Sequence, residues 1–326
     1  MAVGIDHCFR QFNRTNYLFH RRETKRMKTL LHIQGLTKQY GKEKAVDSLT
    51  FSLLKNTSTA LIGPNGAGKT TTLSMLAGLL KQSTGTIVFD GEITEDIRKV
   101  IGFLPQYPKF YSWLTALEFT EMAAKLSGVD AKIAKQEAEK TLEFVGLADA
   151  KNKKTGTFSG GMKQRLGLAQ AIVHKPALLL LDEPVSALDP IGRREIMNLL
   201  KELQATTTIL YSTHILNDAE EMTDQLVFLR KGKLVEQGSM QEVREKYANP
   251  MYKIYFVSSE EAEKFVEISP WPTKQENSIA FIHIEEEKPV MNEVLRVLAD
   301  SHLSLLKVER ATASLEEIFL KVVNEG

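Results

Sequence analysis

The sequence has 326 residues, in which 42 Lys and Arg nearly balance 41 Asp and Glu. Such a balance lacks the long-range positive field that gathers phosphate backbones, so we expect no nucleic-acid partner. One cysteine, Cys8, can form neither an internal disulfide nor a thiolate metal site, which fits a reducing compartment. The longest clean apolar run near the centre covers residues 177–181, much shorter than the ~20 residues that span a bilayer.

Residues 1–28 differ in composition from the rest. Basic residues outnumber acidic ones there, without helical or strand periodicity, and no apolar stretch of ~7–15 residues marks a signal peptide. We expect a disordered extension. The alternatives are a basic arm that touches anionic lipid headgroups, and a biological start at Met27, just ahead of the first predicted strand.

Apolar alternation predicts strands within residues 31–40 and 45–54, and a third strand at 58–63 runs into the loop GPNGAGKTT. This loop matches the phosphate-binding pattern G-x-x-x-x-G-K-[ST], and helical apolar periodicity resumes at Leu73. Glycines let the backbone wrap around phosphates, Lys69 should reach the β- and γ-phosphates, and the Thr70 hydroxyl should bind Mg²⁺. The predicted nucleotide-binding residues of the loop are Gly63, Pro64, Asn65, Gly66, Ala67, Gly68, Lys69, Thr70 and Thr71.

A continuous apolar run at 177–181 ends in Asp182 and Glu183. Unbroken hydrophobicity predicts a strand buried on both faces in a parallel sheet, and ligands bind at the carboxyl ends of such strands. We therefore expect Asp182 to hold Mg²⁺ through water and Glu183 to take the proton of the attacking water. The alternative is that both acids only cap a strand end.

The segment TFSGGMKQR at 157–165 predicts a helix start, with Ser159 as N-cap followed by Gly160 and Gly161. It would form a second cradle for an anion. Because one phosphate group does not need two helix N-termini of the same chain, we expect this cradle to contact ATP held by another subunit.

The string SGGMKQR resembles the signature motif of ABC ATPases, and the chain carries the family's other motifs in the expected order over about residues 31–247. The resemblance implies ATP and Mg²⁺ as ligands and assigns four further residues. Tyr40 would stack on adenine, and Gln106 would contact Mg²⁺ and the attacking water. His214 would contact the γ-phosphate, and Asp189 would lie in a short loop that meets the partner subunit.

Three positions depart from the family pattern. Phe158 and Met162 replace the usual first leucine and final glutamine of the signature, but the serine and both glycines that touch phosphate are kept, so we expect activity to survive. The turn before the phosphate-loop strand lacks the usual glycine, and Asn56 is the residue there best able to adopt a positive φ.

Residues of about 107–172 resemble the family's helical subdomain, and Thr115 with Glu118 predicts a capping box at one helix start. The segment QYPKFYSW at 106–113 concentrates aromatic residues beside Gln106. They either fill the joint between subdomains or line a groove for a short helix of a membrane permease.

From about residue 248 to 326 we expect a small C-terminal α/β domain, with strands within 251–259, 278–284 and 303–311. Ser314 and Glu317 predict a capping box for a last helix whose apolar face must pack against something. The face comprises Leu315, Ile318, Phe319, Val322 and Val323. The segment TASLEEIFL at 312–320 is similar to the tail of ATPases of the drug, lipid and polymer export branch.

Together these patterns predict an α/β fold: a P-loop NTPase core of the ABC ATPase type at 29–247 with an inserted helical subdomain, followed by the C-terminal domain. The expected protein is the ATP-hydrolysing subunit of an ABC transporter, in a homodimer or in a heterodimer with a second ABC ATPase, and the transported substrate would be bound by the permease. It would attach to the cytoplasmic face of the cell membrane through a separate permease and drive export. The alternative is an ABC ATPase of translation or DNA repair; one phosphate loop and no sustained heptads favour the transporter.

Overall fold

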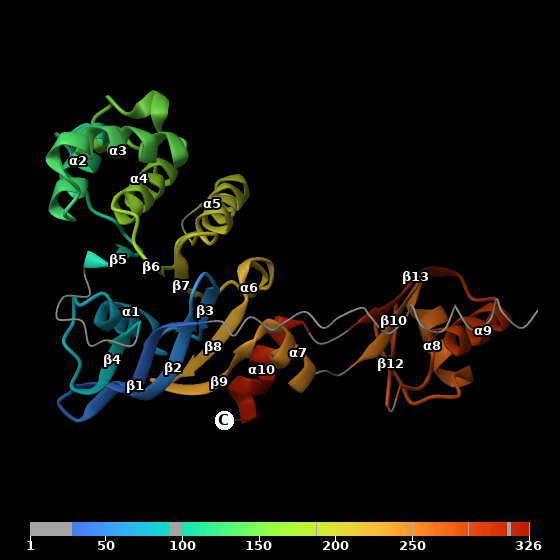
Figure 1. Ribbon diagram of the computed structural model, residues 1–326. Coiled ribbons are helices and arrows are strands. Elements are labelled where there is room, and N and C mark those ends of the chain that lie inside the picture. Colours follow the sequence, from blue (N-terminus) through green and yellow to red (C-terminus); the bar gives the residue numbers. More distant parts are fainter. Residues whose placement is uncertain are drawn as a thin grey trace, which may run out of the picture.

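The computed structural model describes residues 28–90, 99–186, 188–247, 250–285, 287–311 and 314–325. The predicted basic extension lies outside these ranges, except for Lys28. Figure 1 shows a lobe of sheets, a helical lobe above it, and a C-terminal domain set to one side. Among the described residues no helix combines the length and the apolar character needed to cross a membrane.

A six-stranded sheet forms the centre of the sheet lobe, in the order β5-β6-β7-β3-β8-β9. Every residue of β3, β6 and β7 is buried, which explains the unbroken apolar run of β6 from Leu178 to Leu181. Since β6 pairs in parallel with β5 and β7, the prediction of a central parallel strand before Glu183 is confirmed. The strands are β3 (Ser58–Ile62), β5 (Ile101–Leu104), β6 (Leu178–Asp182), β7 (Thr208–Thr213), β8 (Gln225–Arg230) and β9 (Lys233–Ser239).

A second sheet of β1 (Thr29–Tyr40), β2 (Glu43–Leu54) and β4 (Thr84–Phe89) is antiparallel, in the order β2-β1-β4. Its apolar side chains share one core with α1 (Lys69–Leu76) and with the central sheet. The turn between β2 and β3 places Asn56 at φ 56, so the prediction of a positive φ there is confirmed.

The helical lobe contains α2 (Ala116–Leu126), α3 (Ala131–Phe144) and α4 (Gly160–Ile172). Thr115 and Glu118 form the predicted capping box of α2. The Ser159 hydroxyl accepts a hydrogen bond from the backbone N–H of Met162 at 3.3 Å, so its predicted role as N-cap of α4 is confirmed. The remaining elements before residue 248 are η2 (Ala148–Ala150), η3 (Thr155–Thr157), α5 (Pro190–Leu203), α6 (Leu216–Met222) and α7 (Met240–Lys246).

The C-terminal domain has an antiparallel sheet in the order β11-β12-β10-β13, and two helices share its core. Its elements are β10 (Met251–Phe256), α8 (Ser259–Ile268), β11 (Thr273–Glu276), β12 (Ile279–His283), α9 (Met291–Ser301) and β13 (Leu305–Ala311). The three predicted strands are present. The fourth, β11, has the sequence TKQE, which offers no apolar alternation to predict it.

The last helix, α10 (Leu315–Glu325), does not pack into the C-terminal domain's own core. Its buried residues Leu315, Ile318 and Val322 belong instead to the large core of the ATPase domain. The capping box of Ser314 and Glu317 is present, since each backbone N–H donates to the other side chain. The division at residue 247 therefore assigns to the C-terminal domain a helix that completes the core of the preceding domain, as the position of α10 beside α7 and β9 in Figure 1 illustrates.

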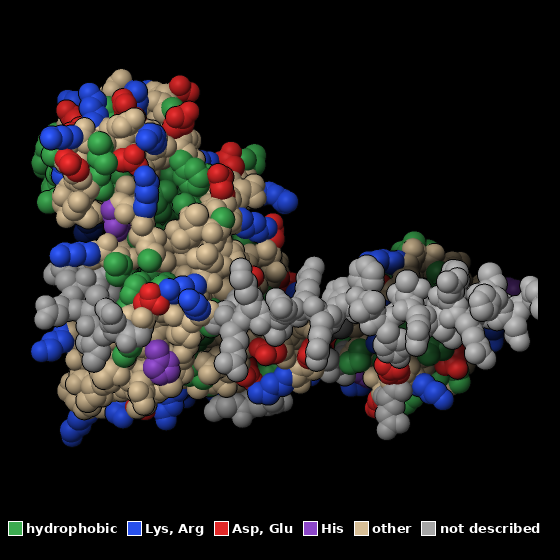
Figure 2. Space-filling model, in the orientation of Figure 1, with side chains coloured by type: hydrophobic (Ala, Val, Ile, Leu, Met, Phe, Trp, Pro, Cys, Tyr) green, Lys and Arg blue, Asp and Glu red, His purple; other side chains and the backbone are tan. Residues whose placement is uncertain are grey.

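Charged side chains of both signs alternate over the exposed parts of the face in Figure 2. Within the helical lobe, charged side chains form ion pairs, such as Lys125 with Glu121 and Lys140 with Glu137. Positive and negative side chains therefore lie close together on this face, in keeping with the near-neutral net charge of the sequence.

Candidate functional site

A cavity of about 970 Å³ opens at the carboxyl end of β3, where the phosphate loop joins α1. Gly66 and Gly68 have φ of 79° and 96°, which L side chains rarely adopt. A Cβ at Gly68 would come within 2.6 Å of the Ala45 carbonyl oxygen, so the loop needs glycine there for both conformation and space. The cavity is therefore lined by backbone that bends tightly against β2.

Lys69, the first residue of α1, is 6% exposed. Its Nζ donates to the carbonyl oxygens of Gly63 at 2.7 Å and Pro64 at 3.2 Å, which holds the side chain along its own loop. Burial lowers the pKa of the Lys69 ammonium, although the nearby Glu183 and Asp182 carboxylates oppose that shift. A phosphate that replaced the two carbonyl oxygens would supply a full negative charge to this buried cation.

Asp182 and Glu183 lie at the end of β6 and share one contact with β7. The Ser212 hydroxyl donates to Asp182 Oδ1 at 2.6 Å and accepts from the backbone N–H of Glu183 at 2.9 Å. Glu183 has φ 48, a left-handed conformation that costs a non-glycine residue roughly 1–2 kcal/mol. Such strain is typical of functional residues, and no pattern in the sequence reveals it.

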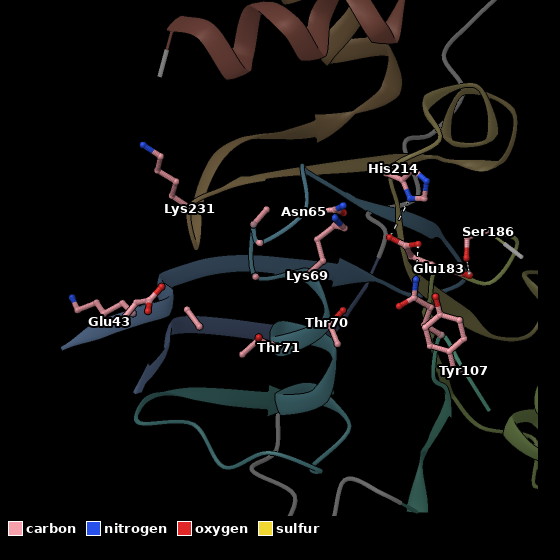
Figure 3. A pocket seen from close by; sticks show the side chains of 16 residues that line it. Glu43, Asn65, Lys69, Thr70, Thr71, Tyr107, Glu183, Ser186, His214 and Lys231 are labelled. Atoms are coloured by element: carbon pink, nitrogen blue, oxygen red, sulfur yellow. Dashed lines mark hydrogen bonds and ion pairs between the residues drawn. The ribbon is translucent and has the colours of Figure 1, made fainter. Parts of the chain in front are cut away.

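Two segments bring polar side chains to the Glu183 carboxylate. Gln106, just after β5, donates from Nε2 to Oε2 at 3.0 Å. His214, just after β7, places Nδ1 at 3.1 Å from Oε1. Figure 3 shows Glu183 between His214 and Tyr107, with the contact to His214 dashed. The three residues predicted to be catalytic are thus in direct contact at the ends of adjacent parallel strands.

Other predicted residues lie elsewhere. Ser159, Gly160 and Gly161 begin α4 in the helical lobe and do not line the cavity, and neither does Asp189, which caps α5 by accepting from the Gly192 N–H at 3.1 Å. Tyr40 ends β1 opposite Glu43, which does line the cavity. Tyr40 is 55% exposed, with Lys38 Nζ 5.1 Å from its ring centroid, and it does not line the cavity itself.

Several residues that the sequence did not single out also belong to the site. Lys44, Ser186 and Lys231 line the cavity. Figure 3 places Lys231 on the side of the phosphate loop away from Glu183.

Another residue, Gln164 of α4, donates from its buried side chain to the Pro184 carbonyl oxygen at 2.7 Å and so links the signature helix to the residue after Glu183. A polar residue inside a helix gave no signal of that contact.

The donor set suits Mg²⁺ bound together with a nucleotide. Oxygen donors are the ligands this ion prefers, and it usually takes one or two carboxylates plus substrate phosphates. Asp182 supplies one buried carboxylate, and the Thr70 hydroxyl follows Lys69 at the start of α1. Within the described ranges, no group of three or more His, Cys, Asp or Glu side chains could hold a metal alone.

A second, more apolar hollow of about 730 Å³ lies between the two lobes. Phe110 and Tyr111 line it, but Tyr107 lines the nucleotide cavity instead, so the predicted aromatic cluster is divided between the two. Phe110 also packs edge-on against Phe119 of α2, with ring centroids 5.0 Å apart. These aromatics thus both support the joint between the lobes and line an open hollow.

The fold and the cavity define a P-loop ATPase. A family model described as "ABC transporter" matches residues 46–186, and one described as "ATP-binding protein DrrA1-3-like, C-terminal domain" matches residues 238–323. The uncharacterized ABC transporter ATP-binding protein YxlF of Bacillus subtilis (strain 168) is 43% identical over 302 residues, which cover 90% of this chain and 100% of that protein. The bacitracin transport ATP-binding protein BcrA of Bacillus licheniformis is 34% identical over 312 residues, 92% of this chain and 99% of BcrA.

Among solved structures, a dimeric ATP-binding cassette in a post-hydrolysis state with ADP and Pi has a TM-score of 0.60 and 26% identity. It is matched over 65% of this chain and 99% of its own. This chain belongs to the family of ABC transporter ATP-binding proteins. Its predicted fold class and its ATPase activity are thereby confirmed.

Proposed function

We propose that this chain is the motor of an ABC exporter, in which two ATPase subunits close on two ATP molecules and drive a separate permease at the cytoplasmic face of the membrane. One observation supports the shared site: of the two predicted phosphate cradles, the one at Ser159 to Gly161 lies outside the cavity of the other. A second subunit can bring that cradle to the cavity. The second subunit is either another copy or a different ABC ATPase.

In the proposed closed state, Lys69 leaves the Gly63 and Pro64 carbonyl oxygens and binds the β- and γ-phosphates. Glu183 takes a proton from the attacking water as general base, and Gln106 and His214 hold its carboxylate and the γ-phosphate in place. The 3.0 Å and 3.1 Å contacts to Glu183 support these roles, because both partners already surround the carboxylate.

We further propose that Mg²⁺ is held by the Thr70 hydroxyl, by Gln106 and, through water, by Asp182. The ion would supply charge neutralisation at the β- and γ-phosphates. Tyr40 would stack on adenine, and its exposure and its place opposite Glu43, which lines the cavity, support that role. Asp189 and the start of α5 would face the partner subunit.

The hollow between the lobes is the proposed docking site of the permease. Leu79 and Leu126 are 65% and 81% exposed at this hollow, which suits an apolar helix laid into a groove. Gly102 and Phe103, from the strand that leads to Gln106, form part of the hollow's lining. Docking there would act directly on the segment that carries Gln106.

For the direction and the cargo, the tail segment and the similarity to BcrA support export, and a bacitracin-like compound is the first cargo to test. The permease gene would be sought beside the gene of this chain, as one that encodes about six apolar spans.

The test is co-expression of the chain with that permease. We expect the chain and the permease to copurify, and we expect cells that express both proteins to export cargo. Leu126→Asp, in the hollow, should abolish copurification, while Leu306→Asp, at another highly exposed leucine in the C-terminal domain, should not. If both variants still assemble with the permease, the proposed docking site is contradicted. If the assembled wild type transports no cargo, the proposed function is contradicted.

A further inference from the structure

Helix α6 begins two residues after His214, so the position of this helix limits where the His214 side chain can lie. It is a short helix of 7 residues, and no side chain caps its N-terminus. Contacts with its neighbours must therefore supply most of what holds it, because helices this short are marginal on their own.

The main neighbour on one side is α10. Leu315 and Ile318 are 0% exposed, and they share a core with Ala219 and Met222 of α6. Phe319 lies beside Phe228 of β8, with ring centroids 6.2 Å apart. This packing joins the far end of the chain to the helix that follows His214.

A polar contact fixes the register of the two helices. The first backbone N–H of α10, that of Leu315, has no partner within its own helix and donates to Glu220 Oε1 of α6 at 2.7 Å. The same oxygen lies 3.4 Å from Arg244 Nη2 of α7. A carboxylate at a helix N-terminus is also favoured by the helix dipole.

The chain reaches α10 only after it has passed through the C-terminal domain. Lys253 of β10 lies 3.9 Å from Glu317 of α10, which gives the domain a contact with the same helix. A displacement of the C-terminal domain would thus be passed to α10 and then, through Glu220, to α6.

We infer that Glu220 is a positioning residue for ATP hydrolysis: it locks α10 to α6 and thereby sets the position of His214 against Glu183. The C-terminal domain controls turnover through this link. The inference rests on the proposed role of His214.

The test compares full-length variants by kcat, KM and the Kd for ATP. Glu220→Ala should lower kcat by roughly 10–100-fold, the scale expected when a catalytic group is misplaced by about 1 Å, with the Kd for ATP unchanged. Glu220→Gln keeps an oxygen acceptor for the Leu315 N–H and should restore most of kcat. Glu221→Ala, the adjacent residue, which pairs with Lys201 at 3.2 Å, is the matched control and should behave like wild type.

A double-mutant cycle separates the inference from the function on which it rests. In the His214→Ala background, Glu220→Ala should have no further effect on kcat, because both changes remove the same contribution. Fully additive effects, or a kcat within twofold of wild type for Glu220→Ala while His214→Ala is impaired, would overturn the inference alone. Normal turnover in His214→Ala would overturn the role of the histidine instead.

If Glu220→Ala does not fold, Ile318→Val replaces it. This change removes one buried methylene from the same helix pair and leaves most of the core intact. It should lower kcat with unchanged ATP affinity, and an unchanged kcat would count against the link.

Discussion

The Glu183 carboxylate and the His214 imidazole meet at 3.1 Å, although they follow two different strands. The contact exists because β6 and β7 are adjacent and parallel, with Asp182 opposite Ser212 in the register, so both chains emerge at the same edge of the sheet. Gln106 reaches the same carboxylate from the next strand, β5. The topology thus gathers three separate sequence motifs around one side chain.

The role of Glu183 as general base leads to the first prediction. Glu183→Gln should keep ATP binding but lose ~10²–10⁴-fold in kcat, the usual contribution of a general base, because an amide takes no proton from water. Single-turnover hydrolysis together with ATP titration checks it. Glu202→Gln, an exposed change on α5, is the control and should leave kcat unchanged. Near-normal turnover in Glu183→Gln would remove that residue from its role.

A shared site predicts that subunits with different lesions restore activity to each other. Lys69→Ala damages the phosphate loop and Ser159→Arg damages the signature cradle, so a mixed dimer places both lesions in one site and leaves the other intact. We expect activity to reappear on mixing. Without permease, ATPase activity should also rise more steeply than linearly with subunit concentration.

The decisive counter-result for the shared site is a constant specific activity on dilution, from a chain shown by light scattering to stay monomeric with ATP bound. Glu183→Gln with ATP provides the positive case, since blocked hydrolysis should trap a stable two-fold dimer. Monomer should dominate without nucleotide.

The positive φ of Asn56 gives a prediction on stability. Asn56→Val should lower the free energy of unfolding by roughly 1–2 kcal/mol, because a β-branched residue is strained in the left-handed conformation. Asn56→Gly should stay within about 0.5 kcal/mol of wild type, since glycine adopts this φ freely. Urea titration of both variants checks the difference, and equal stabilities would show that the turn relaxes.

His174 gives a pH dependence. Burial lowers the pKa of its imidazole below the ordinary 6.5, and its Nε2 lies 3.2 Å from the Ile101 carbonyl oxygen. As pH falls through about 6.5, the unfolded chain takes up a proton that the folded chain does not, so the free energy of unfolding falls. His174→Gln keeps a donor for that carbonyl oxygen but does not titrate, so its stability should fall less between pH 7 and pH 5.

The control for this pH series is Gln170→Ala, a change in the same hollow that removes no titrating group. Its stability curve should run parallel to that of wild type. A His174→Gln curve that also runs parallel would mean that His174 does not contribute to the slope.

Local patterns predicted the elements whose physics is local. The glycines of the phosphate loop, the cap at Ser159 and the turn at Asn56 each satisfy a backbone requirement that neighbouring residues impose, and they are where the sequence places them. The continuous apolar strand before Glu183 was predictable for a similar reason, since burial on both faces leaves a direct mark on composition.

Contacts between distant segments were not predictable in this way. Gln164 meets Pro184, and Glu220 meets Leu315, because the tertiary fold brings them together; either polar side chain could equally have faced water. The apolar face of α10 predicted that this helix packs against another part of the protein, but it did not predict which domain. The strain at Glu183 likewise has no trace in residue type.

The return of α10 has a consequence for how the protein is made. Because Leu315 and Val322 complete the ATPase core, that core cannot close during synthesis until the whole C-terminal domain has emerged from the ribosome. Until then, the surface of α6 and β8 that α10 covers stays open, with Met222 and Phe228 beneath it. A premature stop in the C-terminal domain would therefore leave this apolar surface of the ATPase domain exposed. Such truncated products should be recognised by chaperones and proteases rather than persist as a shortened ATPase.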